Sequence, residues 1–450
     1  MANLNMSYLI EFMRDRATAD KEFQKLNDFL IERNCSFRGE ALPTFLKPYF
    51  ISPKQTTTLQ KVVTIISNVL NKFINYYLEN EEVQKIMAFS KEENELFNIE
   101  PGYSVPLVIS RLDAFMDDYD IQFLEFNCDS PAGTAYADVL EEGFAKFLDK
   151  YSILDYWKIK YYTRQEPLLN ALIACYNEFK GSKRPSKKPT IAIVDWDDVS
   201  TLSEFELLKV FFEAKGYPTI ITTPQKLKIK NGVLTSDDEP IDIVYRRVIQ
   251  RELLQRRDDA EDFIQAAKDG LVCMANPFRS FIVGNKKVLA ILTDPNYQSI
   301  YTREELNIIR NCIPWTQVLS DKKVMFNNFT VNLRTFIYDN REKLVLKPAS
   351  SYGGKDVFIG RDTDEETWHK IVNENIESES WVVQQYVTIP EDIFPDIRNG
   401  NVEMRLKKVN INPFAIYGKY AGTISRISES SVINVSAGGG LIPTMSVSKK

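Results

Sequence analysis

Histidine and cysteine are scarce and scattered in this chain. Among its 450 residues there is one histidine, His369, and five cysteines that lie far apart and form no CxxC pair. These absences exclude a catalytic Ser–His pair and a cluster of histidine ligands, and they give no support to a zinc site or a disulfide framework. His369 falls in an expected surface helix, where we expect it to be structural or inert. Chemistry in this chain must therefore use lysine, arginine, carboxylates, amides, backbone groups and a hard metal ion.

Four further absences narrow the class of protein. The net charge is −6, so no basic surplus favours nucleic acid as a partner. No run of about 18 apolar residues is present, so we expect no membrane-spanning helix. The N-terminal residues mix acids and bases where a signal peptide has an apolar core, and we expect a cytoplasmic protein. Neither GxxxxGK[ST] nor GxGxxG after a strand occurs, which argues against P-loop and dinucleotide-binding folds.

The apolar spacing predicts an α/β protein of several units. Residues 1–104 show the three- and four-residue spacing of helices, and 105–185 contain two strands followed by a helix. Residues 186–275 alternate strand, helix and strand, which predicts a small parallel sheet that binds ligands at the carboxyl ends of its strands. Residues 276–450 are predicted to form a separate nucleotide-binding unit.

The strongest local signal is LVLKPASSYGGK, residues 344–355. Side chains alternate along a strand, so Lys347 should face away from Leu344 and Leu346. A lysine on a core strand is costly unless an anion meets it, and the glycine-rich turn that follows can aim backbone N–H groups at phosphate. A plain hairpin with an edge lysine explains the pattern equally well.

A second segment, FLEFN, suggests a metal site. Glu125 and Asn127 are two apart on a predicted strand, so they should share one face while Leu124 and Phe126 share the other. A carboxylate and an amide oxygen suit Mg²⁺, which completes its shell with phosphate and water. The alternative is a surface face beside a turn. We expect no catalysis by the adjacent Cys128.

Two weaker signals accompany these segments. The strand WVVQQYV, residues 381–387, could offer backbone groups to adenine, although taken alone the pattern favours a core strand. Lys286 opens a predicted helix and could contact phosphate, although a lysine at a helix start is more often solvated.

Taken in chain order, these motifs resemble the ATP-grasp superfamily in its circularly permuted form, which includes eukaryotic glutathione synthetase and glutathionylspermidine synthetase-like proteins. The resemblance covers about residues 105–445. Its motifs are LEFN at 124–127, the α/β unit, the lysine strand with its glycine-rich turn, VVQQYV at 382–387 and NVSAGGGLIP at 434–443. It implies a mixed α/β ATP-grasp fold with an inserted parallel-sheet substrate subdomain and an N-terminal helical region.

The resemblance also implies roles for individual residues. It assigns the metal to Glu125 and Asn127, ATP phosphates to Lys286 and Lys347, and the transferred phosphoryl group to Arg111 and Arg426. It assigns the phosphate lid to Ser350, Ser351, Tyr352, Gly353, Gly354 and Lys355, adenine to Gln384, Gln385, Tyr386 and Val387, and a substrate loop to Ser436, Gly438 and Gly439. Ser130, in the turn after the metal strand, and Arg246, at the carboxyl end of a predicted parallel strand, are further candidate substrate residues. One departure stands out, because glutathione synthetase has a metal-binding glutamate in the lid where this chain has Ser351. The third metal ligand is therefore unassigned, with Glu403 as one substitute.

The implied function is that of an ATP- and Mg²⁺-dependent ligase. It would join a small-molecule or peptide carboxylate to an amine through an acyl phosphate. Relatives are often dimers, which leaves a homodimer open. Two alternatives share the ATP-site residues: an ATP-grasp kinase that phosphorylates a small molecule, and a degenerate ATP-binding or scaffold protein. Arg246, Arg247 and Arg279 could clamp a carboxylated substrate or could be surface arginines paired with acids.

Overall fold

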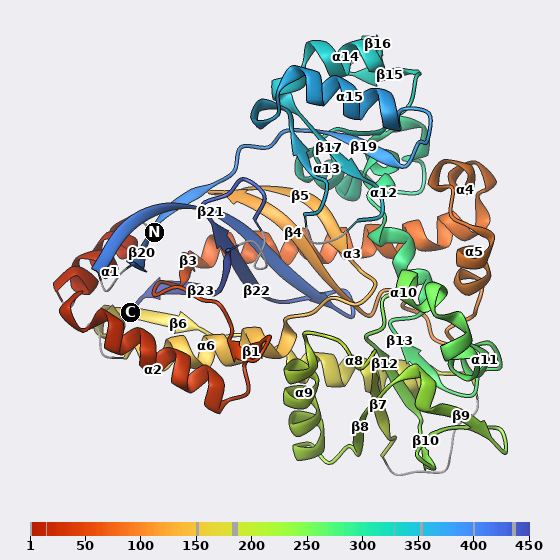
Figure 1. Ribbon diagram of the computed structural model, residues 1–450, viewed down its shortest axis with the longest axis horizontal. Helices are drawn as coiled ribbons and strands as arrows, with labels where there is room; N and C mark the ends of the chain where they lie inside the picture. The colour runs from red at the N-terminus through yellow and green to blue at the C-terminus, as the bar shows by residue number, and fades with distance from the viewer. Residues whose placement is uncertain are drawn as a thin grey trace.

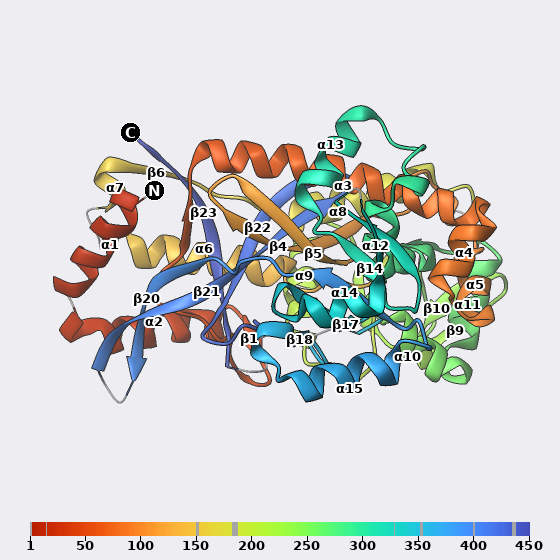
Figure 2. The ribbon, with the colours of Figure 1, turned by 90° about the horizontal axis from the view of Figure 1, so that it is seen from above.

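The computed structural model describes residues 2–14, 16–149, 153–181, 188–327, 329–351, 354–398, 401–433 and 438–450. In Figure 1 a large twisted sheet crosses the middle of the molecule, a smaller sheet with its helices lies above it, and a third sheet lies below it at the right. Figure 2, seen from above, shows the long helix α3 (Pro53–Glu79) running alongside the large sheet. Within the described residues no helix is both long and apolar enough to cross a membrane.

The large sheet joins segments from both ends of the chain. Its strand order is β3-β23-β22-β21-β4-β5, and β20 and β6 extend it by pairing with β21 and β23. The bounds are β3 Tyr49–Ile51, β4 Ile109–Asp117, β5 Asp120–Asn127, β6 Trp157–Lys160, β20 Glu391–Arg398, β21 Asn401–Ile416, β22 Lys419–Ser428 and β23 Gly440–Lys449. These pairs are antiparallel except β3 with β23, which is parallel.

The N-terminal region is helical for most of its length. Its helices are α1 Ala2–Arg14, α2 Ala19–Glu32, α3, α4 Glu81–Met87 and α5 Lys91–Phe97. Helix α3 starts with a capping box between Ser52 and Gln55 and with proline in its first turn, which satisfies N–H groups that a helix start leaves free. The expectation of helix alone is wrong for residues 36–51. Two short strands, β1 Ser36–Phe37 and β2 Glu40–Ala41, pair there, and β3 joins the large sheet through a partner at the far end of the chain.

The predicted parallel sheet is confirmed. Strands β7 Ile191–Val194, β8 Thr219–Thr222, β12 Ile243–Arg246 and β13 Cys273–Ala275 form it in the order β13-β12-β7-β8, with every pair parallel. Helices α8 Gln165–Glu178, α9 Leu202–Ala214, α10 Gln250–Gln255 and α11 Glu261–Lys268 lie around it, beside a small sheet of β9 Leu227–Lys230, β10 Val233–Ser236 and β11 Glu239–Pro240. Helix α6 Thr134–Leu148 lies between α8 and α9 of this unit and β23 of the large sheet. Strands that are buried on both faces explain the continuous apolar run IAIV.

The upper sheet carries the lysine strand. Its order is β14-β19-β17-β18, with β14 Thr316–Val318, β17 Leu344–Pro348, β18 Phe358–Ile359 and β19 Trp381–Gln385. Around it lie α12 Lys287–Thr293, α13 Arg303–Cys312, α14 Leu333–Asp339, α15 Glu365–Asn375 and the hairpin β15 Lys323–Phe326 with β16 Phe329–Asn332. Leu344 and Leu346 pack in a core with Trp368, so Lys347 faces the other side, as alternation predicts.

Asn276 joins the parallel sheet to the large sheet. It is buried directly after β13, and its Oδ1 accepts hydrogen bonds from the backbone N–H groups of Val108 and Ile109 at 3.0 and 2.9 Å. Its Nδ2 donates to the carbonyl oxygens of Ile109 and Cys128 at 2.8 and 3.0 Å. One side chain thus satisfies backbone groups before β4 and after β5, the two strands that lead into the site described below.

We expect Asn276→Ala to destabilise the protein by about 2–4 kcal/mol, because several buried backbone groups lose their partners together. Urea unfolding followed by circular dichroism would measure the change in unfolding free energy. Asn311→Ala removes an exposed asparagine and should stay within about 0.5 kcal/mol of the parent chain. Equal stability of the two variants would contradict the role given to Asn276.

Candidate functional site

A β-bulge in β5 sets the polar face of the site. The register shifts between Asp113 and Ala114, so Asp113 pairs with Glu125 while Ala114 pairs with Phe123, and Leu124 has no partner. The prediction that Leu124 and Phe126 share a face is therefore wrong, because the extra residue of the bulge interrupts the alternation of side chains along the strand. Glu125 and Asn127 share a face, as expected, and Phe126 is buried on the other.

Two lysines from distant parts of the chain converge on Glu125. Lys286 Nζ lies 3.2 Å from Glu125 Oε2 and donates to the carbonyl oxygen of Ser351 at 2.6 Å. Lys347 Nζ donates to Gln384 Oε1 at 2.7 Å, and Lys347 interacts electrostatically with both Glu125 and Lys286. A carboxylate between two buried ammonium groups leaves one positive charge in excess, which suits an anionic ligand.

The environment sets the protonation states of this cluster. Burial raises the pKa of Glu125, but the cations of Lys286, Lys347 and Arg426 outweigh burial and lower that pKa to about 2, so the carboxylate is ionised. Burial lowers the pKa of Lys347 to about 8; Glu125 opposes the change and Lys286 reinforces it. Lys347 is therefore charged at neutral pH and loses its proton in mildly alkaline solution.

We expect affinity for ATP to fall as pH rises from 7 to 9.5, with a midpoint near the Lys347 pKa of about 8. The ammonium that the predicted phosphate contact requires is present below this pKa and lost above it. Titration of a non-hydrolysable ATP analogue at a series of pH values would measure the decline. Lys347→Arg keeps its charge across this interval and should show a flatter profile. The same slope in both proteins would contradict the assignment.

Arg111 and Arg426 are linked by a carboxylate that the sequence reasoning missed. Arg426 donates to Asp113 Oδ2 at 2.8 Å, while Arg111 Nε lies 3.4 Å from Asp113 Oδ1 and its Nη1 donates to the carbonyl oxygen of Ala132 at 2.9 Å. Burial lowers the pKa of Arg111, and the Arg426 charge beside it acts in the same direction. Asp113 is two positions from Arg111 on β4, so strand alternation could have placed it on the same face.

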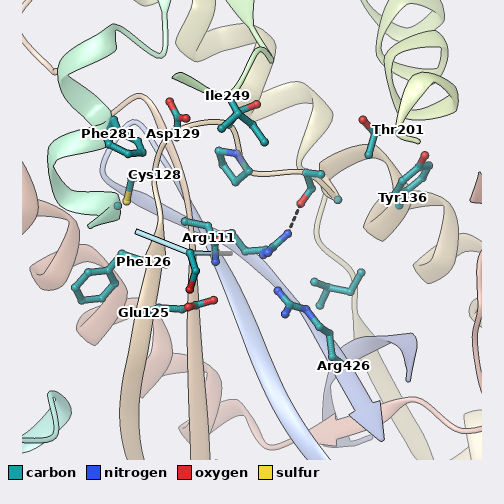
Figure 3. Close-up of a pocket in the computed structure, with 18 of the residues that line it drawn as sticks. Arg111, Glu125, Phe126, Cys128, Asp129, Tyr136, Thr201, Ile249, Phe281 and Arg426 are labelled. Atoms are coloured by element: carbon teal, nitrogen blue, oxygen red, sulfur yellow. Dashed lines mark hydrogen bonds between the residues drawn. The ribbon is translucent and has the colours of Figure 1, made fainter. Parts of the chain in front are cut away.

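Arg111, Glu125, Lys286 and Arg426 line one cavity of about 340 Å³, whereas Asp113 and Lys347 are not among its lining residues. Figure 3 shows Arg111, Arg426 and Glu125 directed into it from the large sheet, with Tyr136 and Thr201 on the far side. The cavity brings together eight of the predicted residues: Arg111, Glu125, Asn127, Ser130, Lys286, Ser350, Ser351 and Arg426. Its size suits a small ligand.

The turn after β17 approaches this cavity from the upper sheet. Asn285 Nδ2 donates to Ser350 Oγ at 2.9 Å, and the Lys286 N–H donates to the carbonyl oxygen of Ala349 at 2.8 Å. Gly354 adopts φ +70°, and a Cβ there would lie 2.6 Å from Val432 Cγ1, so only glycine fits without a shift. Lys355 is exposed. Tyr352 and Gly353 lie outside the described residues.

The predicted adenine segment divides into two parts. The Gln384 side chain is buried, and both ends of its amide are already hydrogen-bonded to protein. Its Oε1 accepts from Lys347, and its Nε2 donates to Thr316 Oγ1 at 3.0 Å. Gln385, Tyr386 and Val387 line a second cavity of about 460 Å³ together with Trp315. This cavity also borders the start of β5, whose other end carries Glu125 and Asn127.

The predicted substrate residues lie in different places. Arg246 is fully buried behind the cavity wall, where it pairs with Asp129 at 2.6 Å and donates to the carbonyl oxygens of Asn276 and Val248. Gly438 and Gly439 line another cavity, against α2 and residues 40–45. Ser436 lies outside the described residues.

Arg247, Arg279 and Glu403, which the sequence offered as further candidates, also contact other protein groups. Arg247 donates to the carbonyl oxygen of Pro131, and Arg279 pairs with Glu100 at 3.0 Å. Glu403 pairs with Arg405 at 2.6 Å on the long β21 strand.

The oxygen donors of this site suit a magnesium ion that is bound partly by the protein and partly by a phosphate-containing ligand. Glu125 is an ionised carboxylate, and the side-chain oxygen of Asn127 beside it is a hard donor. Asn127 Nδ2, which is buried without a hydrogen-bond partner among the described residues, is free to donate to an oxygen of a ligand. Among the described residues, no group of three or more His, Cys, Asp or Glu side chains is placed to bind a metal ion without other ligands. A hard cation here would need phosphate oxygens or water to complete its shell.

Comparison with solved structures identifies the class of fold. A glutathione synthetase-like effector from Globodera pallida superposes with a TM-score of 0.64 over 94% of this chain and 96% of that chain, at 11% sequence identity. A protein described as a gamma-glutamylcysteine synthetase from Methylobacillus flagellatus KT has a TM-score of 0.44 at 9% identity, covering 89% of this chain and 90% of its own. No protein-family model and no curated protein sequence matches the chain. The expected ATP-grasp fold of the glutathione synthetase type is confirmed, and the permuted order stays a prediction.

Proposed function

We propose that this protein is an ATP- and Mg²⁺-dependent ligase that joins a carboxylate to an amine. One observation carries the proposal: Glu125 pairs with Lys286 and interacts electrostatically with Lys347, and Glu125 and Lys286 line a cavity together with Arg111 and Arg426. Catalysis of phosphoryl transfer depends mainly on positioning and on neutralising negative charge, and lysines and arginines supply both without a histidine base.

Each residue of the site is assigned one role in this reaction. Lys286 would exchange its contacts with Glu125 and Ser351 for phosphate oxygens, while Lys347 holds the triphosphate from the upper sheet. A substrate carboxylate oxygen bonds to the γ-phosphorus as ADP leaves. The amine nitrogen then attacks the acyl carbon, inorganic phosphate departs and the amine releases a proton. Arg111 and Arg426 stabilise the charge that builds up on the transferred group.

Glu125 and Asn127, with phosphate oxygens, would hold Mg²⁺, whose contribution is to neutralise charge between neighbouring phosphates. The turn from Ser350 to Lys355 would close over the nucleotide and exclude water from the acyl phosphate. Gln385 to Val387 would hold adenine in the second cavity.

An assay of ADP release from MgATP, across a matrix of carboxylates and amines, tests the proposal. ADP should form when an effective pair is present, and hydroxylamine should trap the acyl phosphate as a hydroxamate. A stable phosphorylated product without any amine would instead identify a kinase. Tight ATP binding with no ADP in any mixture would identify a degenerate binding protein, and either outcome would overturn the ligase proposal.

A further inference from the structure

We propose that the carboxylate substrate carries an apolar side chain, which binds against a wall built from β22, β23 and the N-terminal hairpin β1–β2. The inference rests on the proposed function and adds a substrate class to it: a small carboxylic acid, such as an amino acid, with an aliphatic or aromatic side chain.

The large sheet changes from polar to apolar across the floor of the cavity. Arg426 on β22 pairs with Leu441 on β23, and cross-strand partners share a face. Ile424 lies two residues before Arg426 and therefore points the same way. All three line the cavity. The face thus runs from Glu125 on β5, past the two arginines, to Ile424 and Leu441.

The N-terminal hairpin completes this apolar end. The Leu441 N–H donates to the carbonyl oxygen of Pro43 at 2.8 Å, which holds Leu42 beside the start of β23. Ser203 Oγ donates to the carbonyl oxygen of Ser36 at 2.8 Å and shares a 2.6 Å hydrogen bond with the Tyr136 hydroxyl. Phe37, Leu42, Tyr136 and Leu441 all line the cavity, and the Tyr136 hydroxyl is already engaged by Ser203.

Charge orients the ligand in this cavity. The cations among its described lining residues are Arg111, Arg426 and Lys286, which gather around the carboxylates of Asp113 and Glu125, and none of them comes from the hairpin or from α6. A carboxylate should therefore bind beside these cations and leave the rest of the molecule against the apolar wall. Arg426 borders Leu441, but Phe37, Leu42 and Tyr136 bring no cation to their side of the wall, so a second carboxylate there would be buried without a cation, which is costly. An acidic side chain is thus disfavoured and an apolar one fits.

Binding of amino acids to the full chain tests this inference independently of turnover. Isothermal titration calorimetry, with a non-hydrolysable ATP analogue and Mg²⁺ present, would compare L-leucine and L-phenylalanine with L-glutamate. We expect the two apolar acids to bind at least about tenfold more tightly, the discrimination that a hydrophobic pocket can supply.

Phe37→Ala should weaken L-phenylalanine binding about five- to tenfold, because it removes part of the apolar wall. Glu40→Ala, on the same hairpin but outside this cavity, is the matched control and should leave binding unchanged. Leu441→Ala is a second test at the opposite side of the wall, and thermal unfolding would show whether each variant folds.

The two proposals fail in different ways. If L-glutamate binds as tightly as L-leucine, or if none of these acids binds, the apolar subsite is overturned. Turnover of acidic substrates alone would keep the ligase proposal and overturn the subsite. If apolar acids bind with the expected dependence on Phe37 but no amine elicits ADP release, the subsite stands and the ligase proposal fails.

Discussion

Lys347→Met should abolish ATP turnover while the protein stays folded. Lys347 is a buried cation on β17 that interacts electrostatically with Glu125 and Lys286, and Met has a similar length without the charge. Loss of a contact that acts mainly in the transition state should lower kcat/KM about 10²–10³-fold. Steady-state ADP release would measure the loss.

The stability of this variant has a defined pH dependence. The folded-state pKa of Lys347 is lowered to about 8, so folding disfavours the protonated form. That penalty is fully present below pH 8 and is relieved as pH rises toward the pKa of an unfolded lysine, about 10.4. Lys347→Met should therefore be at least as stable as the parent chain at pH 7, and this advantage should shrink above pH 8.

Lys343→Met provides the matched control, since Lys343 is exposed just before the same strand. It should leave both turnover and stability unchanged. Full activity of Lys347→Met, or loss of activity only through unfolding, would show that Lys347 has no part in ATP chemistry.

Glu125→Gln should also suppress turnover about 10²–10³-fold and should raise the Mg²⁺ concentration needed for half-maximal rate. The substitution keeps the shape of the side chain but removes the charge that lies between Lys286 and Lys347. Because Glu125 raises the pKa of Lys347, the variant should also shift the pH dependence of ATP binding to lower pH.

ADP release at varied Mg²⁺ would measure the first effect, and analogue titration at varied pH the second. Asp117→Asn, at the exposed end of β4, is the control for loss of a carboxylate in this sheet. An unchanged Mg²⁺ requirement in Glu125→Gln would remove Glu125 from the proposed metal site.

Local sequence patterns predicted which strands and residues form the site better than they predicted which of those residues contact one another. Alternation along β17 correctly separated Lys347 from Leu344 and Leu346, because a strand in a packed sheet obeys a two-residue period. The same rule misplaced Leu124, since a bulge is a property of the strand pair and leaves little trace in one strand.

The role expected for Arg246 shows a different limit. The sequence puts it at the carboxyl end of a parallel strand, and the structure confirms that location. Whether an arginine there faces ligand or protein depends on what packs above it, and here Asp129, from the loop after β5, takes its guanidinium. Arg246 therefore supports the loop that borders the cavity.

The sequence by itself determined the chemistry available to this protein: lysines on strands, a carboxylate and amide on one face, a glycine-rich turn, and no histidine apparatus. These follow from residue type and short-range periodicity. Only the tertiary structure decided that Glu125 meets Lys286 and Lys347, that Asp113 bridges two arginines, and that an N-terminal hairpin walls the cavity. The physical reason is that these contacts depend on strand pairing and sheet packing between segments hundreds of residues apart, which local sequence does not encode.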